Sequence, residues 1–386
     1  MAETLAPEIA SSDPASFPWS VFHDRHPVLI ERVATAFPRP AAHRDALEAL
    51  LVESTSGVVT PPDVDALRHE PWPWWRPEYR GVPWGETPFL WAESYFYRRL
   101  LDAVDYFVPG PWRGIDPFAP TKAAELAGDA VDAELAALDD LADRGPDAQW
   151  DALVASSLWG NRADLSFRLG PTAGGDAGGL IADDSEALRA LLRDRPPGRV
   201  HLIADNAGRE LLPDLVLLDH LLGAGLATDV VLHVKPHPYY VSDATAADVL
   251  AGVGRLAAAT GRAGAVGERL AAHLRDGRLA LDAHEFFCAP LTYQAMPLEL
   301  RARFAEASLT IAKGDLNYRR LVGDRHWQPT EPFAELTAHF PSPLAALRTL
   351  KCDVAVGLTP QTVERLDATG RSWRLTGEYA VIHTKA

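Results

Sequence analysis

The chain has 386 residues, of which 47% are apolar and 23% are charged, so it can hold two domains and a large core. Its formal charge of −16 argues against a nucleic-acid partner, because phosphate backbones are bound through basic patches; a phosphorylated small molecule stays possible. Only two cysteines occur, which excludes a disulfide framework and a cysteine-rich zinc site.

Residues 1–16 predict a disordered tail, since Ala, Ser, Pro and acidic residues dominate MAETLAPEIASSDPAS. This start lacks the basic residues and apolar core of a signal peptide. No run approaches the roughly 20 apolar residues that span a bilayer. We therefore expect a soluble cytoplasmic protein without a membrane partner, whose oligomeric state the sequence does not indicate.

Residues 17–155 predict a helical N-terminal domain, because their patterns are helical or loop-like without convincing strands. Residues 88–107, PFLWAESYFYRRLLDAVDYF, have the periodicity of a long helix. The preceding stretch PWPWWRPEYRGVPWGE is no regular element, because Pro fixes φ and removes a donor. We expect its tryptophans to be packing wedges between the two parts of the chain.

Residues 156–386 predict an α/β/α domain. RVHLIADN, DVVLHVK, RLALDAHEF, ASLTIAKG and EYAVIHTK are apolar and strand-like, whereas 244–260, 263–275, LELRARFAEA and PLAALRTLK look helical. Alternating strands and helices predict a three-layer fold with a mainly parallel sheet. The glycines of GPTAGGDAGG make no dinucleotide fingerprint, because no strand precedes them.

Oxygen ligands follow two of these strands. Residues 199–243 have the pattern of strand, tight turn, helix and strand, which is one βαβ unit. Asp205 and Asn206 follow its first strand and Asp243 its second, and ligands bind beyond the carboxyl ends of parallel strands. Two carboxylates and an amide oxygen suit a divalent cation such as Mg²⁺ or Mn²⁺. The alternative is that Asp205 and Asp243 only cap the helices that follow them.

Basic and amide side chains follow a third strand, in LTIAKGDLNYRRLVGD. Gly314 permits a sharp exit from this strand, and Asp315 can cap the next helix. Lys313, Asn317 and Arg319, with the N–H groups at the helix N-terminus, form a candidate phosphate cradle.

The segment RTLK offers two more cations. We expect Arg348 and Lys351 on one face of a helix, where they either bind an anion or are solvated. Taken with the acids at the strand ends, these bases favour a site that combines a metal ion with a phosphate.

Other chemistries lack their motifs. The sequence has no G-x-S-x-G nucleophile elbow and no G-x-x-x-x-G-K-[ST] P-loop. His233 and His237 have the spacing of a helical zinc pair, but Pro236 between them excludes that helix.

Four motifs together resemble the signature set of the metal-dependent damage-control phosphatases, a family first catalogued as a domain of unknown function. They are DNAGRE (205–210), YVSD (240–243), KGDLNYR (313–319) and RTLK (348–351). SLWGNRADLS and WAESYFYRR also resemble the subgroup labelled acidic-residue methyltransferase-like. The similarity covers most of the chain after about residue 80 and implies a helical N-terminal region beside a three-layer α/β/α domain.

The resemblance implies that Asp205, Asn206 and Asp243 are the metal ligands and catalytic residues. It implies that seven residues contact the substrate: Glu210, Asp315, Leu316, Asn317, Tyr318, Arg319 and Lys351. The candidate phosphate cradle described above adds Lys313 to this set. Similar proteins hydrolyse phosphomonoesters, including sugar phosphates such as fructose 1-phosphate, with Mn²⁺, Co²⁺, Ni²⁺ or Mg²⁺. We therefore expect a metal-dependent phosphomonoesterase whose partner is a small phosphorylated metabolite.

In this hypothesis Lys313, Arg319 and Lys351 spread the charge that develops on the phosphoryl group. The sequence leaves open whether an aspartate or a metal-bound water attacks the phosphorus. One alternative is an S-adenosylmethionine-dependent protein-glutamate carboxyl methyltransferase, which would want a glycine-rich turn where DNAG has one glycine. The other is a non-catalytic sugar-phosphate binding protein.

Overall fold

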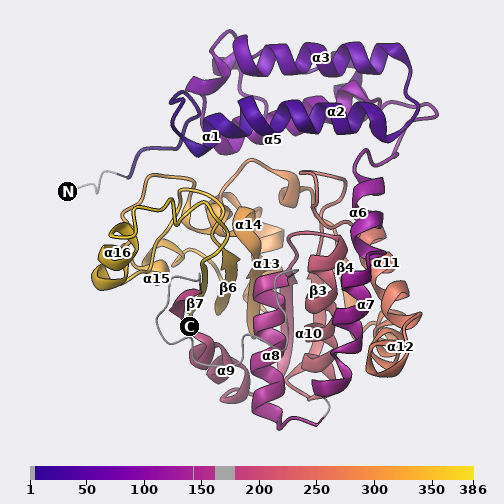
Figure 1. Cartoon of the computed structure of the whole chain (residues 1–386), viewed down its shortest axis with the longest axis vertical. Helices are drawn as coiled ribbons and strands as arrows, with labels where there is room; N and C mark the ends of the chain where they lie inside the picture. The colour runs from indigo at the N-terminus through magenta and orange to yellow at the C-terminus, as the bar shows by residue number, and fades with distance from the viewer. Residues whose placement is uncertain (1–4, 142, 161–178) are drawn as a thin grey trace.

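The computed structural model describes residues 5–141, 143–160 and 179–386. They form a seven-stranded sheet with helices on both faces and a helical N-terminal region above one edge (Figure 1). This confirms the expected three-layer α/β/α fold. Within the described ranges, no helix combines the length and apolar character that crossing a membrane requires.

The sheet has the strand order β1-β7-β6-β5-β2-β3-β4, and only the pair β6 and β7 is antiparallel. The strands are β1 (Leu180–Asp183), β2 (Gly198–Ile203), β3 (Ala227–His233), β4 (Leu279–Asp282), β5 (Leu309–Lys313), β6 (Leu344–Thr349) and β7 (Ala380–Lys385). The central strands are nearly continuous apolar runs because parallel sheets are covered on both faces.

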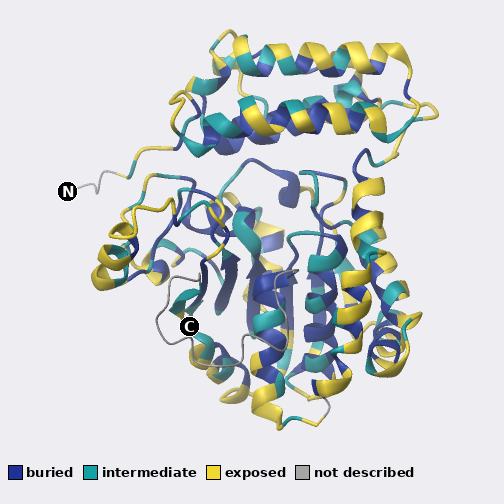
Figure 2. Ribbon diagram, in the orientation of Figure 1, coloured by how far each residue is buried: buried dark blue, intermediate teal, exposed yellow. Residues whose placement is uncertain are grey.

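Two hydrophobic clusters lie on opposite faces of the sheet. Leu309 and Ile311 of β5 belong to the cluster formed with the helices between residues 146 and 276, whereas Ala312 belongs to the cluster with the helices between residues 298 and 336. Figure 2 shows the buried strands between these layers. The helices are α6 (Ala119–Leu126), α7 (Asp129–Ala136), α8 (Pro146–Trp159), α9 (Ser185–Arg193), α10 (Leu211–Gly223), α11 (Ala246–Ala257), α12 (Gly261–Asp276), α13 (Leu298–Ala305), α14 (Gly314–Val322), α15 (Phe333–Leu336) and α16 (Pro360–Asp367).

Helix α5 (Phe89–Ala103) joins the N-terminal region to the carboxyl edge of the sheet. Trp72 and Trp84 stack on its Tyr95, so the Pro- and Trp-rich loop wraps this helix. On another side, Tyr97 stacks on Tyr240 of the loop after β3, with ring centroids 4.7 Å apart. The helices of this region are α1 (Phe17–Ser20), α2 (His26–Ala36), α3 (Ala41–Ser56), α4 (Val64–His69) and α5 (Phe89–Ala103).

The stretch PLAALRTLK, expected to be a helix, contains strand β6 instead. Ala and Leu favour a helix in isolation, but here the segment pairs with β5 and β7 and most of it is buried. Lys351 therefore lies in the loop after β6 and shares no helix face with Arg348. Strand β1 and helix α9 were not expected at all.

Two further segments differ from the expectation. Ile9, placed in the expected disordered tail, is buried; its N–H donates to the Asp324 carbonyl at 3.1 Å and its carbonyl accepts the Phe89 N–H at 2.7 Å. Helices α7 and α8, expected within the helical N-terminal domain, pack against α10, α12 and β6 and so cover the sheet.

Candidate active site

The loops after β2 and β3 bring Asp205, Asn206 and Asp243 together. Asn206 and Asp243 form an antiparallel bridge, and the Ala244 N–H donates to the Asp205 carbonyl at 2.9 Å. Because β2 and β3 are neighbours in the sheet, these backbone bonds fix the three side chains at its carboxyl edge.

Neither aspartate caps a helix. Helix α11 is capped by Thr245, which forms a capping box with Asp248. Within the described part of the chain, no side-chain hydrogen bond caps α10 or the short 3₁₀ turn before it. The Asp243 Oδ2 instead accepts the Tyr240 N–H at 3.0 Å within its own loop. The capping alternative for these two acids is therefore wrong.

Asp205 lies in a strongly negative environment. Enclosure by protein, followed by the charges of Asp243 and Glu210, raises the pKa of Asp205 to about 8, although Lys351 and Lys235 oppose this shift. A bound cation would relieve the repulsion between these carboxylates.

Asn206 links the acids to one another. Its Nδ2 donates to Glu210 Oε2 at 2.7 Å and to Asp205 Oδ2 at 3.2 Å, while Ser242 Oγ donates to its Oδ1 at 2.7 Å. In the described part of the chain, no three His, Cys, Asp or Glu side chains gather as a metal site. The candidate ligands Asp205, Asn206 and Asp243 are two carboxylates and one neutral amide. Oxygen atoms of both kinds are ligands that Mg²⁺ and Mn²⁺ accept.

The cleft that Asp205 and Asn206 line also contains two lysines. Lys313, the last residue of β5, is buried; its Nζ lies 3.1 Å from Asp214 Oδ1 and donates to the Ser157 carbonyl. Lys351 lines the same cleft with a side chain that is 48% exposed, and its Nζ is 3.8 Å from Glu210 Oε1. Among the residues that the structure describes, the cleft therefore offers one buried and one solvated cation.

Sequence reasoning missed Ser157 and Asp214, which line this cleft from α8 and α10. Ser157 Oγ donates to Asp214 Oδ1 at 2.6 Å, and burial raises the pKa of Asp214. An acid inside the apolar helix LLPDLVLLDHLL was the available signal. Residues 161–178, which hold the rest of SLWGNRADLS, lie outside the described residues.

Helix α14 starts directly against Asp205. Gly314 has a φ of +83°, and a Cβ there would lie 1.8 Å from Asp205 Oδ2, so only glycine permits this approach. Among the described residues, no side-chain hydrogen bond caps the N-terminus of α14. Its first N–H groups and the positive end of its dipole are therefore available to an anion near the cleft.

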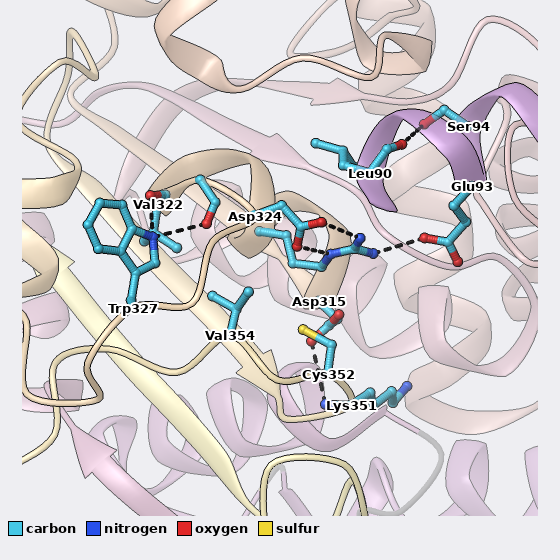
Figure 3. A network of polar contacts seen from close by, with 12 residues as sticks. Leu90, Glu93, Ser94, Asp315, Val322, Asp324, Trp327, Lys351, Cys352 and Val354 are labelled. Atoms are coloured by element: carbon cyan, nitrogen blue, oxygen red, sulfur yellow. Dashed lines mark hydrogen bonds and ion pairs between the residues drawn. The ribbon is translucent and has the colours of Figure 1, made fainter. Parts of the chain in front are cut away.

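Asp315 fixes the loop that carries Lys351. Its Oδ1 accepts Arg348 Nε at 2.8 Å. The same oxygen accepts the Lys351 N–H at 3.4 Å (Figure 3). Burial opposes the charge of Asp315, but Arg348 and Arg319 lower its pKa below the usual value. Asp315 therefore positions the loop after β6.

The next three residues of KGDLNYR lie outside the cleft. Leu316 is buried in a small apolar cluster. Asn317 Nδ2 donates to the Lys313 carbonyl at 2.8 Å, and Tyr318 Oη bonds His383 Nδ1 at 3.0 Å. These side chains fix α14 to its neighbours.

Arg319 is also turned away from the cleft. Its Nε and Nη2 donate to Asp324 at 2.8 and 2.9 Å, and its Nη1 donates to Glu93 Oε2 at 3.0 Å. Figure 3 shows Asp324 and Glu93 on two sides of this network. The guanidinium joins α14 to α5, so its partners are carboxylates of the protein.

We expect Arg319→Met to cost about 3–5 kcal/mol of unfolding free energy, because it leaves two buried carboxylates without their cationic partner. Urea denaturation measures this loss. In the matched variant Arg325→Met, a partly exposed pair with Glu8 is removed, and the cost should stay below about 1 kcal/mol. Equal stabilities of the two variants would show that the buried network contributes nothing beyond a surface pair.

Comparison with known proteins gives one family. The family model described as "Damage-control phosphatase ARMT1-like domain" matches residues 21–366. A mouse protein named damage-control phosphatase ARMT1 is 34% identical, and the match covers 78% of this chain and 74% of the mouse protein. The human protein of the same name is 32% identical, over 77% of this chain and 74% of its own.

A solved structure shares the fold. The crystal structure of a DUF89 family protein from Pyrococcus horikoshii superimposes with a TM-score of 0.50 and covers 95% of this chain and 98% of its own. At 15% sequence identity this likeness concerns the fold alone.

Proposed function

Because this chain belongs to the ARMT1-like damage-control phosphatase family, we propose that it is a metal-dependent phosphatase of small metabolites, with sugar phosphates such as fructose 1-phosphate as substrates. The observation that supports this most strongly is the meeting of Asp205, Asn206 and Asp243 beside Lys313 and the uncapped N-terminus of α14. Such a site places cation ligands and anion donors together along one cleft.

In this proposal Asp205, Asn206 and Asp243 hold the divalent cation, which polarises the phosphoryl group when bound. The Asn206 amide now presents Nδ2 to the acids, so it must turn over to present Oδ1 to a cation. Ser242 Oγ can accept from Nδ2 after that turn, since a hydroxyl is both donor and acceptor. The amide of Asn206 must therefore rotate before it fits the cation.

The phosphate contacts we propose are Lys351, Lys313 and the first N–H groups of α14. Lys351 is partly solvated and held loosely by Glu210, so it can move to a phosphate oxygen. Lys313 is the buried cation of the same cleft. Asp315, Leu316, Asn317, Tyr318 and Arg319 act by holding α14 and the Lys351 loop, whereas the resemblance assigned them to substrate contact.

A phosphate-release assay tests the function. The full chain is incubated with a panel of sugar phosphates, after dialysis against chelator and with Mn²⁺, Co²⁺, Ni²⁺ or Mg²⁺ restored. We expect release only with metal, strongest with Mn²⁺ or Co²⁺. Full activity in excess chelator would refute the metal, and no release from any phosphomonoester would refute the phosphatase.

We expect Lys351→Ala to lower kcat/KM by on the order of 10²-fold, the loss seen when one preorganised charge-stabilising donor is removed. Lys351→Arg should recover only part of this loss, because a planar fork does not replace a point charge. Since the side chain is half-exposed, thermal melting should be unchanged. A wild-type rate in Lys351→Ala would mean that this lysine is merely solvated.

A further inference from the structure

Helix α6 lies across the two loops that carry Asp205 and Asp243. Gly208, after the Asp205 loop, approaches α6 so closely that a Cβ would lie 2.7 Å from Glu125 Oε2 and 3.5 Å from the Lys122 carbonyl oxygen. From the same helix, the Lys122 side chain reaches the backbone of Asp243. Helix α6 therefore contacts the loop after β2 and the loop after β3.

The Lys122 ammonium has one acceptor for each of its three donors. Its Nζ lies 2.9 Å from the Asp243 carbonyl oxygen, 3.0 Å from Asp116 Oδ2 and 3.0 Å from Asp248 Oδ2. The residue is only 5% exposed. Burial opposes its charge, but Asp116 and Asp248 raise the pKa of Lys122 above its usual value, so it stays protonated at neutral pH.

Backbone bonds hold the residues on either side of Asp243: the Ser242 carbonyl accepts the Ala207 N–H at 2.6 Å, and the Ala244 N–H donates to the Asp205 carbonyl at 2.9 Å. The Tyr240 N–H holds the carboxylate from within the loop, and Asn206 bridges the backbone on one side. Lys122 holds the carbonyl of the same residue and ties it to Asp248, the capping-box residue of α11. The backbone of Asp243 is thus fixed relative to two helices.

We propose that Lys122 is a positioning residue for metal binding, because it fixes the backbone of Asp243 and so keeps its carboxylate beside Asp205. The inference rests on the proposed metal site and adds to it a residue from the N-terminal half of the chain. Lys122 contacts neither the cation nor the substrate. Residues that orient metal ligands typically change metal affinity by about 10- to 100-fold when they are removed.

The direction of the change in Mn²⁺ affinity distinguishes a positioning role of Lys122 from an effect of its charge. Removal of a positive charge near a cation site strengthens cation binding by Coulomb's law alone. Loss of positioning weakens it, because the ligand loop must then be ordered by the cation itself. Weaker Mn²⁺ binding in a variant without Lys122 therefore cannot come from the change in charge.

The test is calorimetric titration of Mn²⁺ into the metal-free full chain. We expect Lys122→Met to raise the Kd for Mn²⁺ by about 10- to 100-fold. Because Lys122→Met leaves two acids unpaired and can fail to fold, the double variant Lys122→Met with Asp116→Asn is measured as well; it keeps the net charge and should show the same loss. At saturating Mn²⁺, turnover should approach that of the wild type with an unchanged substrate KM.

Arg99→Met is the matched control. Arg99 pairs with Glu53 between α5 and α3, so its removal breaks a largely buried ion pair away from the cleft. Its Kd for Mn²⁺ should stay within about twofold of the wild type. The inference is overturned if the folded Lys122 variants bind Mn²⁺ as tightly as the wild type or more tightly, or if Arg99→Met weakens binding equally. If the wild type binds no Mn²⁺, the proposed metal site fails first, and the inference fails with it.

Discussion

Asp243→Asn should fold, melt at or above the temperature of the metal-free wild type, and lose nearly all turnover. The Tyr240 N–H bond survives, because the amide oxygen of Asn can accept it. The repulsion between Asp243 and Asp205 disappears, which favours the metal-free protein. We expect a loss on the order of 10³-fold in kcat, the upper range for one preorganised electrostatic group.

The thermal shift with Mn²⁺ is the second readout for this variant. Stabilisation by a ligand grows as RT ln(1 + [L]/Kd), so a variant that has lost a ligand should lose most of the shift. Asp219→Asn is the control, since Asp219 is a buried acid of α10 that pairs with Arg269 away from the cleft. It should lose stability and keep the shift. A full Mn²⁺ shift in Asp243→Asn would exclude this residue as a ligand.

Gly314→Ala should remove activity and destabilise the protein together. A Cβ at this position would lie 1.8 Å from Asp205 Oδ2, so Asp205 or the start of α14 must move. Strain at φ of +83° adds about 1–2 kcal/mol, and overpacking adds typically about 1–3 kcal/mol. We expect both a loss of unfolding free energy in urea and a loss of Mn²⁺ binding by calorimetry.

Gly277→Ala separates backbone strain from the clash. Gly277 has a φ of +80°, nearly that of Gly314, but a Cβ there meets nothing within 4 Å. This variant should lose about 1–2 kcal/mol and keep wild-type Mn²⁺ affinity and turnover. If Gly314→Ala behaves like Gly277→Ala in all three measurements, the close contact between α14 and Asp205 has no role in the site.

The sequence by itself determined the sheet layers and the place where the candidate metal ligands gather. Apolar runs in RVHLI and DVVLHV mark strands buried on both faces, and turn residues mark where each strand ends. Since neighbouring parallel strands end at one edge, the chain order alone predicts that Asp205, Asn206 and Asp243 lie together. The sharp exit from the strand at Gly314 could also be predicted from local geometry, because such a turn favours glycine.

Only the tertiary structure decided which side chains face the cleft. Strand β6 was expected to be a helix because its pairing with β5 and β7 lies outside any local window. Arg319 meets Glu93 from 226 residues away, and Lys122 meets the Asp243 backbone from 121 residues away. A buried cation must be paired, and packing between distant elements selects the carboxylates that pair with it. Sequence spacing could therefore locate the candidate metal ligands, but it could not distinguish the lysines that line the cleft from the cations that hold it together.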